Sequence, residues 1–334
     1  RGVIYDRFGE PLAVSTPVSA VYTNPRAGLL DADSQAILCS QLALDCNQLA
    51  RALKRQAGQS FAYIRRGVAW EDVQRLKALD LPGVHFLKEY RRFYPAGETT
   101  AHVVGITDID DVGIEGIEKS FESTLQGEPG RRVVLKDRRG NVIKDLGSGE
   151  AARFGGDLTL SIDLRLQFLA YRELKAAVQS HRAVSGSMVM LDVTTGEILA
   201  MVNQPAYNPN DVLSSTRGMR NRAVTDLYEP GSTMKPFAVL AALESGEFER
   251  DTLIDTAPGW YRVGRDTIRG KNRGEISMET VLKKSSQVGI AKIAMALDER
   301  AVFELMTRGG VGDYLGTGLH GEVAGKLTDK DLDK

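Results

Sequence analysis

A glycine-rich segment, GSGEAARFGGD at residues 147–157, most constrains how this chain can fold. Before it, short strand-like and helical patterns alternate, whereas after it a strand leads into a long amphipathic helical pattern. Domain boundaries fall in exposed glycine-rich linkers, and a length of 334 residues is typical of roughly two domains. The sequence therefore predicts one domain at residues 1–150 and a second at residues 151–334.

Hydrophobic spacing and turn residues predict the elements on either side of this boundary. Apolar residues recur with a helical period in some segments and alternate in others. Helical periodicity covers residues 31–57, where Asp45 or Asn47 offers a cap for a second helix. Further predicted helices cover residues 71–80, 113–127 and 277–297, the last broken near Ser285. Predicted hairpins cover residues 131–146, turning at Arg139-Gly140-Asn141, and 185–209, turning at Thr194-Thr195-Gly196. These elements indicate a mixed α+β chain.

Charge and cysteine content exclude several classes of function. The formal net charge is −1, which gives no electrostatic basis for binding nucleic acid. Cys39 and Cys46, the only cysteines, have no histidine near them and are too few for a zinc site. On one continuous helix they lie about 10 Å apart along the axis, too far for a disulfide. A turn at Leu44-Asp45 brings them within reach, so both states stay open.

The start of the sequence is compatible with an anchor upstream. The chain begins at Arg1 without an initiator methionine, and no stretch approaches the ~18 apolar residues of a membrane span. We therefore expect a trimmed boundary at residue 1, which leaves room for an anchor upstream.

The segment DLYEPGSTMKPFAVLAALESG, residues 226–246, carries a candidate nucleophile and its base. A proline fits only the first turn of a helix, so Pro236 predicts a helix that begins close to Ser232, at its positive end. Lys235 lies about one turn further on, so the two side chains share a face. A lysine whose pKa is lowered by burial can activate a serine for acyl transfer. The alternative is that Ser232 is an ordinary helix N-cap.

A second polar motif lies downstream, in KKSSQVG at residues 283–289. Ser285 offers a hydroxyl suited to proton relay, and Gln287 offers an amide suited to holding a substrate carbonyl. An S-x-x-K pair with a later serine-containing motif is typical of serine β-lactamases and penicillin-binding proteins. The second motif therefore strengthens the catalytic interpretation of the first.

A series of further motifs carries a family resemblance over nearly the whole chain. In order, they are RGVIYDRFGEPLAVS, RRFYPAGETTAHVVGI, GIEGIEKSFE, LSIDLRLQ, GSMVMLDVTTGEILAMVNQPAYNPN and MRNRAVTDLYEPGSTMKPF. The chain resembles a class B penicillin-binding protein, closest to the division-specific (septal) peptidoglycan transpeptidases. The resemblance implies a penicillin-binding-protein/β-lactamase-like transpeptidase domain, an antiparallel sheet with helices on both faces. An elongated mixed α/β non-catalytic pedestal module of the dimerisation type precedes it.

The resemblance also assigns roles to the candidate residues. It makes Ser232 the nucleophile toward the penultimate D-Ala of a stem peptide, and Lys235 the general base. Ser285 becomes the proton relay to Lys235 and the leaving group, while Gln287, with Ser286 beside it, positions the substrate. The implied reaction is serine-type D-Ala-D-Ala transpeptidation, which joins two peptidoglycan stems without a metal or cofactor. β-Lactams acylate the same serine because they mimic the D-Ala-D-Ala end.

Two departures from the family pattern bear on activity. Position 287 is Gln where the family has Asn. The extra methylene moves the side-chain amide by about 1.5 Å. A shift of ~1 Å can lower a reaction rate on the order of 100-fold. The third family motif, Lys-Ser/Thr-Gly, does not occur between Ser285 and Lys334. We therefore expect residues 1–334 to be a fragment or a truncated product, inactive alone, with unpartnered strands and an uncovered apolar helix.

The N-terminal module carries no catalytic constellation. By resemblance it is a pedestal that contacts a membrane-embedded glycan polymerase and other division proteins, at the periplasmic face of the bacterial inner membrane. Its charged residues are expected to form an interdomain salt-bridge set of Arg91, Arg92, Tyr94, Glu115 and Glu118. Two other functions stay open. One is a D,D-carboxypeptidase or β-lactamase, in which water replaces the acceptor amine, and the other is a non-enzymatic penicillin-binding or sensor module.

Overall fold

The computed structural model of the chain divides into two compact units. The described residues are 1–131, 133–136, 142–147, 149–211 and 218–328. The first unit is Arg1–Ala223 and the second is Val224–Lys334. This division differs from the predicted boundary between residues 150 and 151, which stays a prediction.

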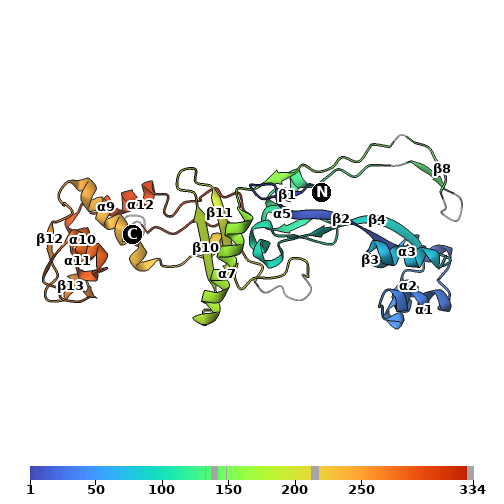
Figure 1. Cartoon of the computed structure of the whole chain (residues 1–334), viewed down its shortest axis with the longest axis horizontal. Coiled ribbons are helices and arrows are strands. Elements are labelled where there is room, and N and C mark those ends of the chain that lie inside the picture. The colour runs from blue at the N-terminus through green and yellow to red at the C-terminus, as the bar shows by residue number, and fades with distance from the viewer. Residues whose placement is uncertain (132, 137–141, 148, 212–217, 329–334) are drawn as a thin grey trace. The chain divides into compact units, whose positions relative to one another are not determined.

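The first unit contains most of the strands (Figure 1). Its strands are β1 (Ile4–Tyr5), β2 (Pro11–Thr23), β3 (Ala62–Val68), β4 (His85–Phe93), β5 (Ile106–Thr107), β6 (Gly113–Glu115), β7 (Val134–Lys136), β8 (Val142–Asp145), β9 (Leu158–Thr159), β10 (Gly186–Leu191) and β11 (Ile198–Gln204). Its helices are η1 (Pro25–Ala27), α1 (Ala32–Gln41), α2 (Cys46–Arg55), α3 (Trp70–Ala78), η2 (Gly97–Thr99), α4 (Ala101–Val104), α5 (Gly116–Ser120), α6 (Glu122–Leu125), α7 (Leu164–Ser180) and α8, which begins here and spans Arg222–Thr225.

The long strand β2 organises the N-terminal part of this unit. It pairs antiparallel with β4 along most of its length, from Val14 to Tyr22. Its C-terminal end also pairs antiparallel with β3, and its N-terminal end pairs with β1. Helices α1, α2 and α3 lie beside this sheet (Figure 1) and bury an apolar core against it. The best buried members of that core are Val21, Leu38, Leu53, Val73 and Leu76.

The turn between α1 and α2 decides whether the two cysteines form a disulfide. Helix α1 ends at Gln41 and α2 begins at Cys46, so residues 31–57 form two helices, and the second begins at one of the two predicted caps. Asp45 caps the second helix, because its carboxylate accepts hydrogen bonds from the backbone of Asn47 and Gln48. The turn brings the Cα atoms of Cys39 and Cys46 to 5.6 Å, and the two residues form a disulfide.

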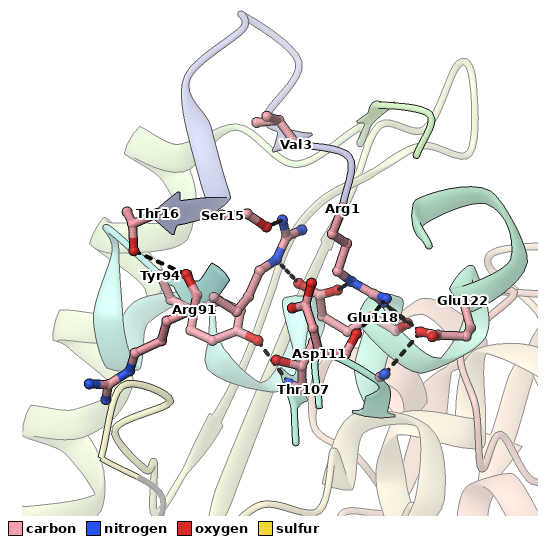
Figure 2. Close-up of polar contacts among 12 residues, drawn as sticks. Arg1, Val3, Ser15, Thr16, Arg91, Tyr94, Thr107, Asp111, Glu118 and Glu122 are labelled. Carbon is pink, nitrogen blue, oxygen red and sulfur yellow. Dashed lines mark hydrogen bonds and ion pairs between the residues drawn. The ribbon is translucent and has the colours of Figure 1, made fainter. Parts of the chain in front are cut away.

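A buried ion network joins Arg1 to the middle of the module (Figure 2). Glu118 accepts from Arg1 Nε at 2.7 Å and from Arg92 Nε at 2.6 Å, and its side chain is 0% exposed. Arg1 also pairs with Glu122 at 2.6 Å. Arg92 and Glu118 both precede residue 150, so the expected interdomain character of this pair is wrong. Its charges stabilise the module internally.

Arg91 and Tyr94 do link the two sides of the predicted boundary. Arg91 donates to the carbonyl of Asn210 at 3.2 Å, and the backbone N–H of Tyr94 donates to the Asn210 side chain at 3.0 Å. The Tyr94 hydroxyl accepts from the Thr107 N–H at 2.9 Å (Figure 2). These contacts are hydrogen bonds rather than salt bridges. Glu115 contributes its backbone, to the pairing of β6 with β5.

The prediction of one helix at residues 113–127 is wrong. The segment forms strand β6 and two short helices, α5 and α6. The break occurs at Gly116, which has a φ of 62° and lies so close to Gly105 that a Cβ there would be 2.6 Å from the Gly105 nitrogen. Only glycine tolerates both conditions, so the backbone turns where apolar spacing alone suggests continuity.

For the hairpin at residues 131–146, strands β7 and β8 pair, and the predicted turn lies outside the described residues.

The remainder of the first unit contains the second predicted hairpin. Strands β10 and β11 pair antiparallel and turn at residues 194–196, as predicted. Helix α7 packs on them (Figure 1), and the buried side chain of Gln167 bonds both the N–H and the carbonyl of Met201. No third strand joins this sheet among the described residues, and Val189 and Leu191 are 43% and 54% exposed. Unpartnered strands of this kind were expected.

The second unit is mainly helical. It contains the rest of α8, η3 (Gly231–Met234), α9 (Lys235–Ser245), α10 (Met278–Lys283), α11 (Gln287–Ala296), α12 (Ala301–Arg308), β12 (Leu253–Asp255), β13 (Trp260–Val263), β14 (Asp266–Arg269) and β15 (Glu275–Ser277). Helices α9, α10, α11 and α12 enclose its core, whose members include Val239, Ala242, Met278, Val281 and Ile293. Leu240 and Leu243 on α9 are each 46% exposed, so part of this apolar helix is uncovered, as expected. No helix among the described residues is long and apolar enough to cross a membrane.

Candidate active site

The candidate nucleophile lies in the turn that begins a helix, as predicted. A 3₁₀ turn at Gly231–Met234 leads directly into α9, in which Pro236 occupies the first turn. The backbone N–H of Lys235 donates to the carbonyl of Ser232, so one turn joins the two residues. No side-chain hydrogen bond caps either helix, so Ser232 is not an N-cap. Its exposed hydroxyl makes no hydrogen bond within the described residues.

Lys235 reaches from this turn to the second polar motif. Its Nζ donates to Ser285 Oγ at 2.8 Å and to the Ser285 carbonyl oxygen at 2.7 Å. The lysine is half-buried, and this desolvation lowers its pKa because burial disfavours the charged form. A lysine with a lowered pKa is neutral more often near pH 7, which is the state that accepts a proton.

The second motif occupies the break between α10 and α11, which confirms the predicted interruption near Ser285. Ser285 has a φ of 49°, a left-handed conformation that residues other than glycine rarely adopt. Ser286 is 7% exposed, and its hydroxyl caps α11 by accepting from the Gly289 N–H. Gln287 is the first residue of that helix and is exposed. Among the described residues, Lys235 has no hydrogen bond to Gln287.

Close helix packing fixes this arrangement. Helices α9, α10 and α11 share the core around Val281, so the start of α9 and the break before α11 lie at one end of the same cluster. Gly289 permits the approach, because a Cβ there would be 2.7 Å from a methyl group of Val281. The rigid cluster holds Lys235 against Ser285 although 50 residues separate them.

The structure thus brings three of the predicted residues together and leaves two beside them. Ser232 and Lys235 share one turn, and Lys235 contacts Ser285. Gln287 and Ser286 follow in sequence, but only the helix-capping contact of Ser286 is formed. Sequence reasoning missed the Ser285 carbonyl, which is a second acceptor for the lysine. No sequence signal identifies it, because it depends on the backbone conformation at that residue.

The arrangement suits nucleophilic acyl transfer. It combines a free hydroxyl at a helix start, an adjacent lysine of lowered pKa and a second hydroxyl within hydrogen-bond distance of that lysine. No group of three or more His, Cys, Asp or Glu side chains in the described part of the chain is placed to hold a metal ion.

Comparison with known families agrees with this chemistry. The penicillin-binding protein dimerisation domain matches residues 1–160, and the penicillin-binding protein transpeptidase domain matches residues 186–334. A chain that carries both modules in this order, with a Ser-x-x-Lys turn in the second, is a penicillin-binding protein of the two-module type. The chain therefore belongs to the class B penicillin-binding proteins.

Curated relatives narrow the comparison. The chain is 43% identical to the peptidoglycan D,D-transpeptidase FtsI of Escherichia coli K12, over 99% of this chain and 57% of that protein. It is 40% identical to the probable peptidoglycan D,D-transpeptidase PbpC of Pseudomonas aeruginosa, over 98% of this chain and 58% of the relative. It is 39% identical to the probable peptidoglycan D,D-transpeptidase PenA of Neisseria gonorrhoeae, over 98% of this chain and 57% of that protein. The chain thus spans somewhat more than half the length of these relatives.

Solved structures show the same fold. A Helicobacter pylori penicillin-binding protein, PBP2, in complex with MreC has a TM-score of 0.79 at 23% identity, over 100% of this chain and 68% of that one. A peptidoglycan synthetase from Bifidobacterium adolescentis has a TM-score of 0.71 at 23% identity, over 99% of this chain and 66% of that one. The predicted fold class, a transpeptidase domain preceded by a non-catalytic mixed α/β module, is confirmed.

Proposed function

We propose that the protein is a peptidoglycan D,D-transpeptidase that cross-links stem peptides through an acyl-serine, at the division septum. The observation that carries this proposal is the contact of Lys235 with Ser285, one turn from the free hydroxyl of Ser232. Similarity to the FtsI transpeptidases supports the reaction and the septal role. The N-terminal module, predicted at residues 1–150, then serves as a non-catalytic pedestal.

The first half of the reaction forms the acyl-enzyme. Neutral Lys235 takes the proton of Ser232 Oγ as that oxygen attacks the carbonyl carbon of the penultimate D-Ala. The backbone N–H of Ser232 helps to bind the developing oxyanion. When the peptide bond breaks, the leaving D-Ala nitrogen receives a proton from Ser285 Oγ, and Lys235 replaces that proton through the hydrogen bond between them. The products are free D-Ala and an acyl-serine.

The second half transfers the acyl group to another stem. An amine of the acceptor stem attacks the acyl-serine carbonyl, and its proton passes through Ser285 and Lys235 back to Ser232 Oγ. Gln287 positions the donor stem, with its exposed side chain at the start of α11. Ser286 supports that position by capping the same helix. No step needs a metal or cofactor.

Localisation and partners follow as part of the same proposal. The Cys39–Cys46 disulfide supports a compartment outside the reducing cytoplasm, such as the periplasm. We place the protein at the periplasmic face of the bacterial inner membrane, held by an N-terminal anchor. The proposed partners are a membrane glycan polymerase and other division proteins, and β-lactams are the inhibitors.

Two measurements test the function. Mass spectrometry after incubation with a penicillin should use the protein together with whatever sequence follows residue 334, because residues 1–334 alone are expected to be inactive. A stable adduct on Ser232 is expected there, and its absence would favour a non-enzymatic sensor module. The acylation measurements proposed below use the same protein. Product analysis with a stem pentapeptide and an acceptor amine then separates the enzymes. A cross-linked product supports transpeptidation, whereas free D-Ala with hydrolysed stem alone would favour a D,D-carboxypeptidase. Ser232→Ala is the matched control for both measurements.

A further inference from the structure

A basic, aromatic face lies on the hairpin of β13 and β14. Trp260 pairs with Arg269 across the two strands, and Arg262 pairs with Thr267. Residues opposite one another in an antiparallel pair point to the same face, so these four side chains share one side. All four are exposed, and Trp260 remains 52% exposed. A large aromatic side chain between two arginines is thus presented to solvent.

The opposite face of the hairpin packs on α11. Tyr261 is half-buried there, with the Nζ of Lys292 5.7 Å from its ring centroid. The end of β14 also reaches the candidate active site. A Cβ on Gly270 would be 3.7 Å from the Cβ of Gln287 and 3.6 Å from the nitrogen of Val288. The hairpin is therefore anchored beside the residue proposed to position the substrate.

The charge of this segment contrasts with that of the whole chain. The chain has a formal net charge of −1. Between residues 260 and 274, the only acidic residue is Asp266, and the basic residues are Arg262, Arg265, Arg269, Lys271 and Arg273. All five basic side chains are exposed, and none forms an ion pair within the described residues. Such an unpaired cluster attracts and orients anionic ligands.

We propose that this face binds the free carboxylates of peptidoglycan stem peptides, with Trp260 packing against a sugar ring of the same strand. Guanidinium groups bind carboxylates in a bidentate geometry, which suits Arg262 and Arg269. The flat apolar ring of Trp260 fits the C–H face of a sugar. The inference rests on the proposed function, because it assigns the hairpin to the substrate of that reaction. It adds a site that holds the strand outside the catalytic residues.

Direct binding tests the proposal without catalysis. In a Ser232→Ala background, fluorescence anisotropy measures the affinity for labelled, uncross-linked peptidoglycan strands with pentapeptide stems. Arg262→Glu/Arg269→Glu should weaken binding about tenfold, because each exposed charge contributes modestly and each reversal adds repulsion. It should also flatten the salt dependence. Trp260→Ala should weaken binding about threefold with the salt dependence unchanged.

Matched controls make the test specific. Arg51→Glu/Arg55→Glu changes the net charge equally on exposed residues of α2, and it should leave affinity unchanged. Strands whose stem carboxylates are converted to amides should bind the Ser232→Ala protein about tenfold more weakly than unmodified strands do. This second arm needs no hairpin variant, so it decides the question even if the reversal variant misfolds. Equal affinity for both strand preparations would overturn the proposal, as would equal binding of a single-stranded DNA of matched charge.

Separate measurements distinguish a failure of the proposed function from a failure of this inference. Acylation of the protein with unaltered hairpin and intact Ser232 by a small penicillin tests the catalytic proposal by itself, because that measurement uses neither a glycan strand nor a hairpin variant. If no protein variant acylates but strand binding still depends on the arginines, the catalytic proposal fails and this inference stands. If acylation is normal but strand binding ignores the arginines, the inference fails alone.

Discussion

Lys235 Nζ lies 2.8 Å from Ser285 Oγ and 2.7 Å from the carbonyl oxygen of the same residue. Ser285 therefore supplies two acceptors to the lysine, from a backbone with a φ of 49°. A left-handed conformation costs a residue with a Cβ roughly 1–2 kcal/mol. The arrangement thus depends on a strained backbone as well as on a hydroxyl, and the two contributions can be separated by substitution.

Replacing Ser285 should separate its hydroxyl from its backbone. Ser285→Ala keeps the carbonyl contact but removes the proton relay, so the acylation rate with a penicillin should fall on the order of 100-fold. Ser285→Gly should show the same fall in acylation rate. Its free energy of unfolding should be about 1 kcal/mol higher than that of the alanine variant. Stopped-flow acylation and urea unfolding measure the two effects. An alanine variant that acylates at the wild-type rate would exclude the relay.

The pH dependence of acylation should report the state of Lys235. Desolvation lowers its pKa from the ordinary value of 10.5. The base acts in its neutral form, so the acylation rate should be low while the lysine is protonated and rise as pH passes through the lowered pKa. The midpoint should lie below 10.5. Lys235→Arg, which stays protonated, should show no such rise, and a midpoint at or above that of free lysine contradicts the prediction.

Removing the charge of Glu118 should destabilise the N-terminal module strongly. Glu118→Gln removes the ion-pair partner of Arg92 and leaves Arg1 paired only with the partly exposed Glu122, although both arginine side chains are 1% exposed. Breaking a buried pair in this way costs about 3–5 kcal/mol. Glu122→Gln is the matched control and should cost less, because that side chain is 25% exposed. Urea unfolding compares the two variants, and equal losses would mean that burial does not govern this network.

Removing the disulfide should loosen the two N-terminal helices. Cys39 and Cys46 close a loop with a sequence separation of 7. Cross-linking so short a loop restricts the unfolded chain and contributes about 2 kcal/mol in the chain-entropy model. Cys39→Ser/Cys46→Ser should therefore lower the free energy of unfolding by that amount, as should a reductant on the unaltered protein. If penicillin acylation of Ser232 changes as well, the disulfide is coupled to catalysis, which is not expected.

Local signals predicted the parts of the site that lie within one turn of helix. Pro236 and the turn before it fixed where α9 begins, and a spacing of three residues then placed Ser232 and Lys235 together. The turn that pairs Cys39 with Cys46 was likewise visible as one of two alternatives. The helix predicted across Gly116 failed, because a close approach to Gly105 is a long-range contact that apolar spacing does not record.

Contacts between distant segments were decided only by the tertiary structure. Ser285 reaches Lys235 because α9, α10 and α11 pack around one core, and no periodicity in either segment encodes that distance. Burial of the same cluster lowers the lysine pKa, which spacing alone does not set. Arg1 and Glu118 meet across 117 residues of sequence for the same reason. The sequence by itself determined which chemical groups are present and how neighbours in one turn are arranged, and packing determined their long-range partners, because those depend on how whole elements fit together.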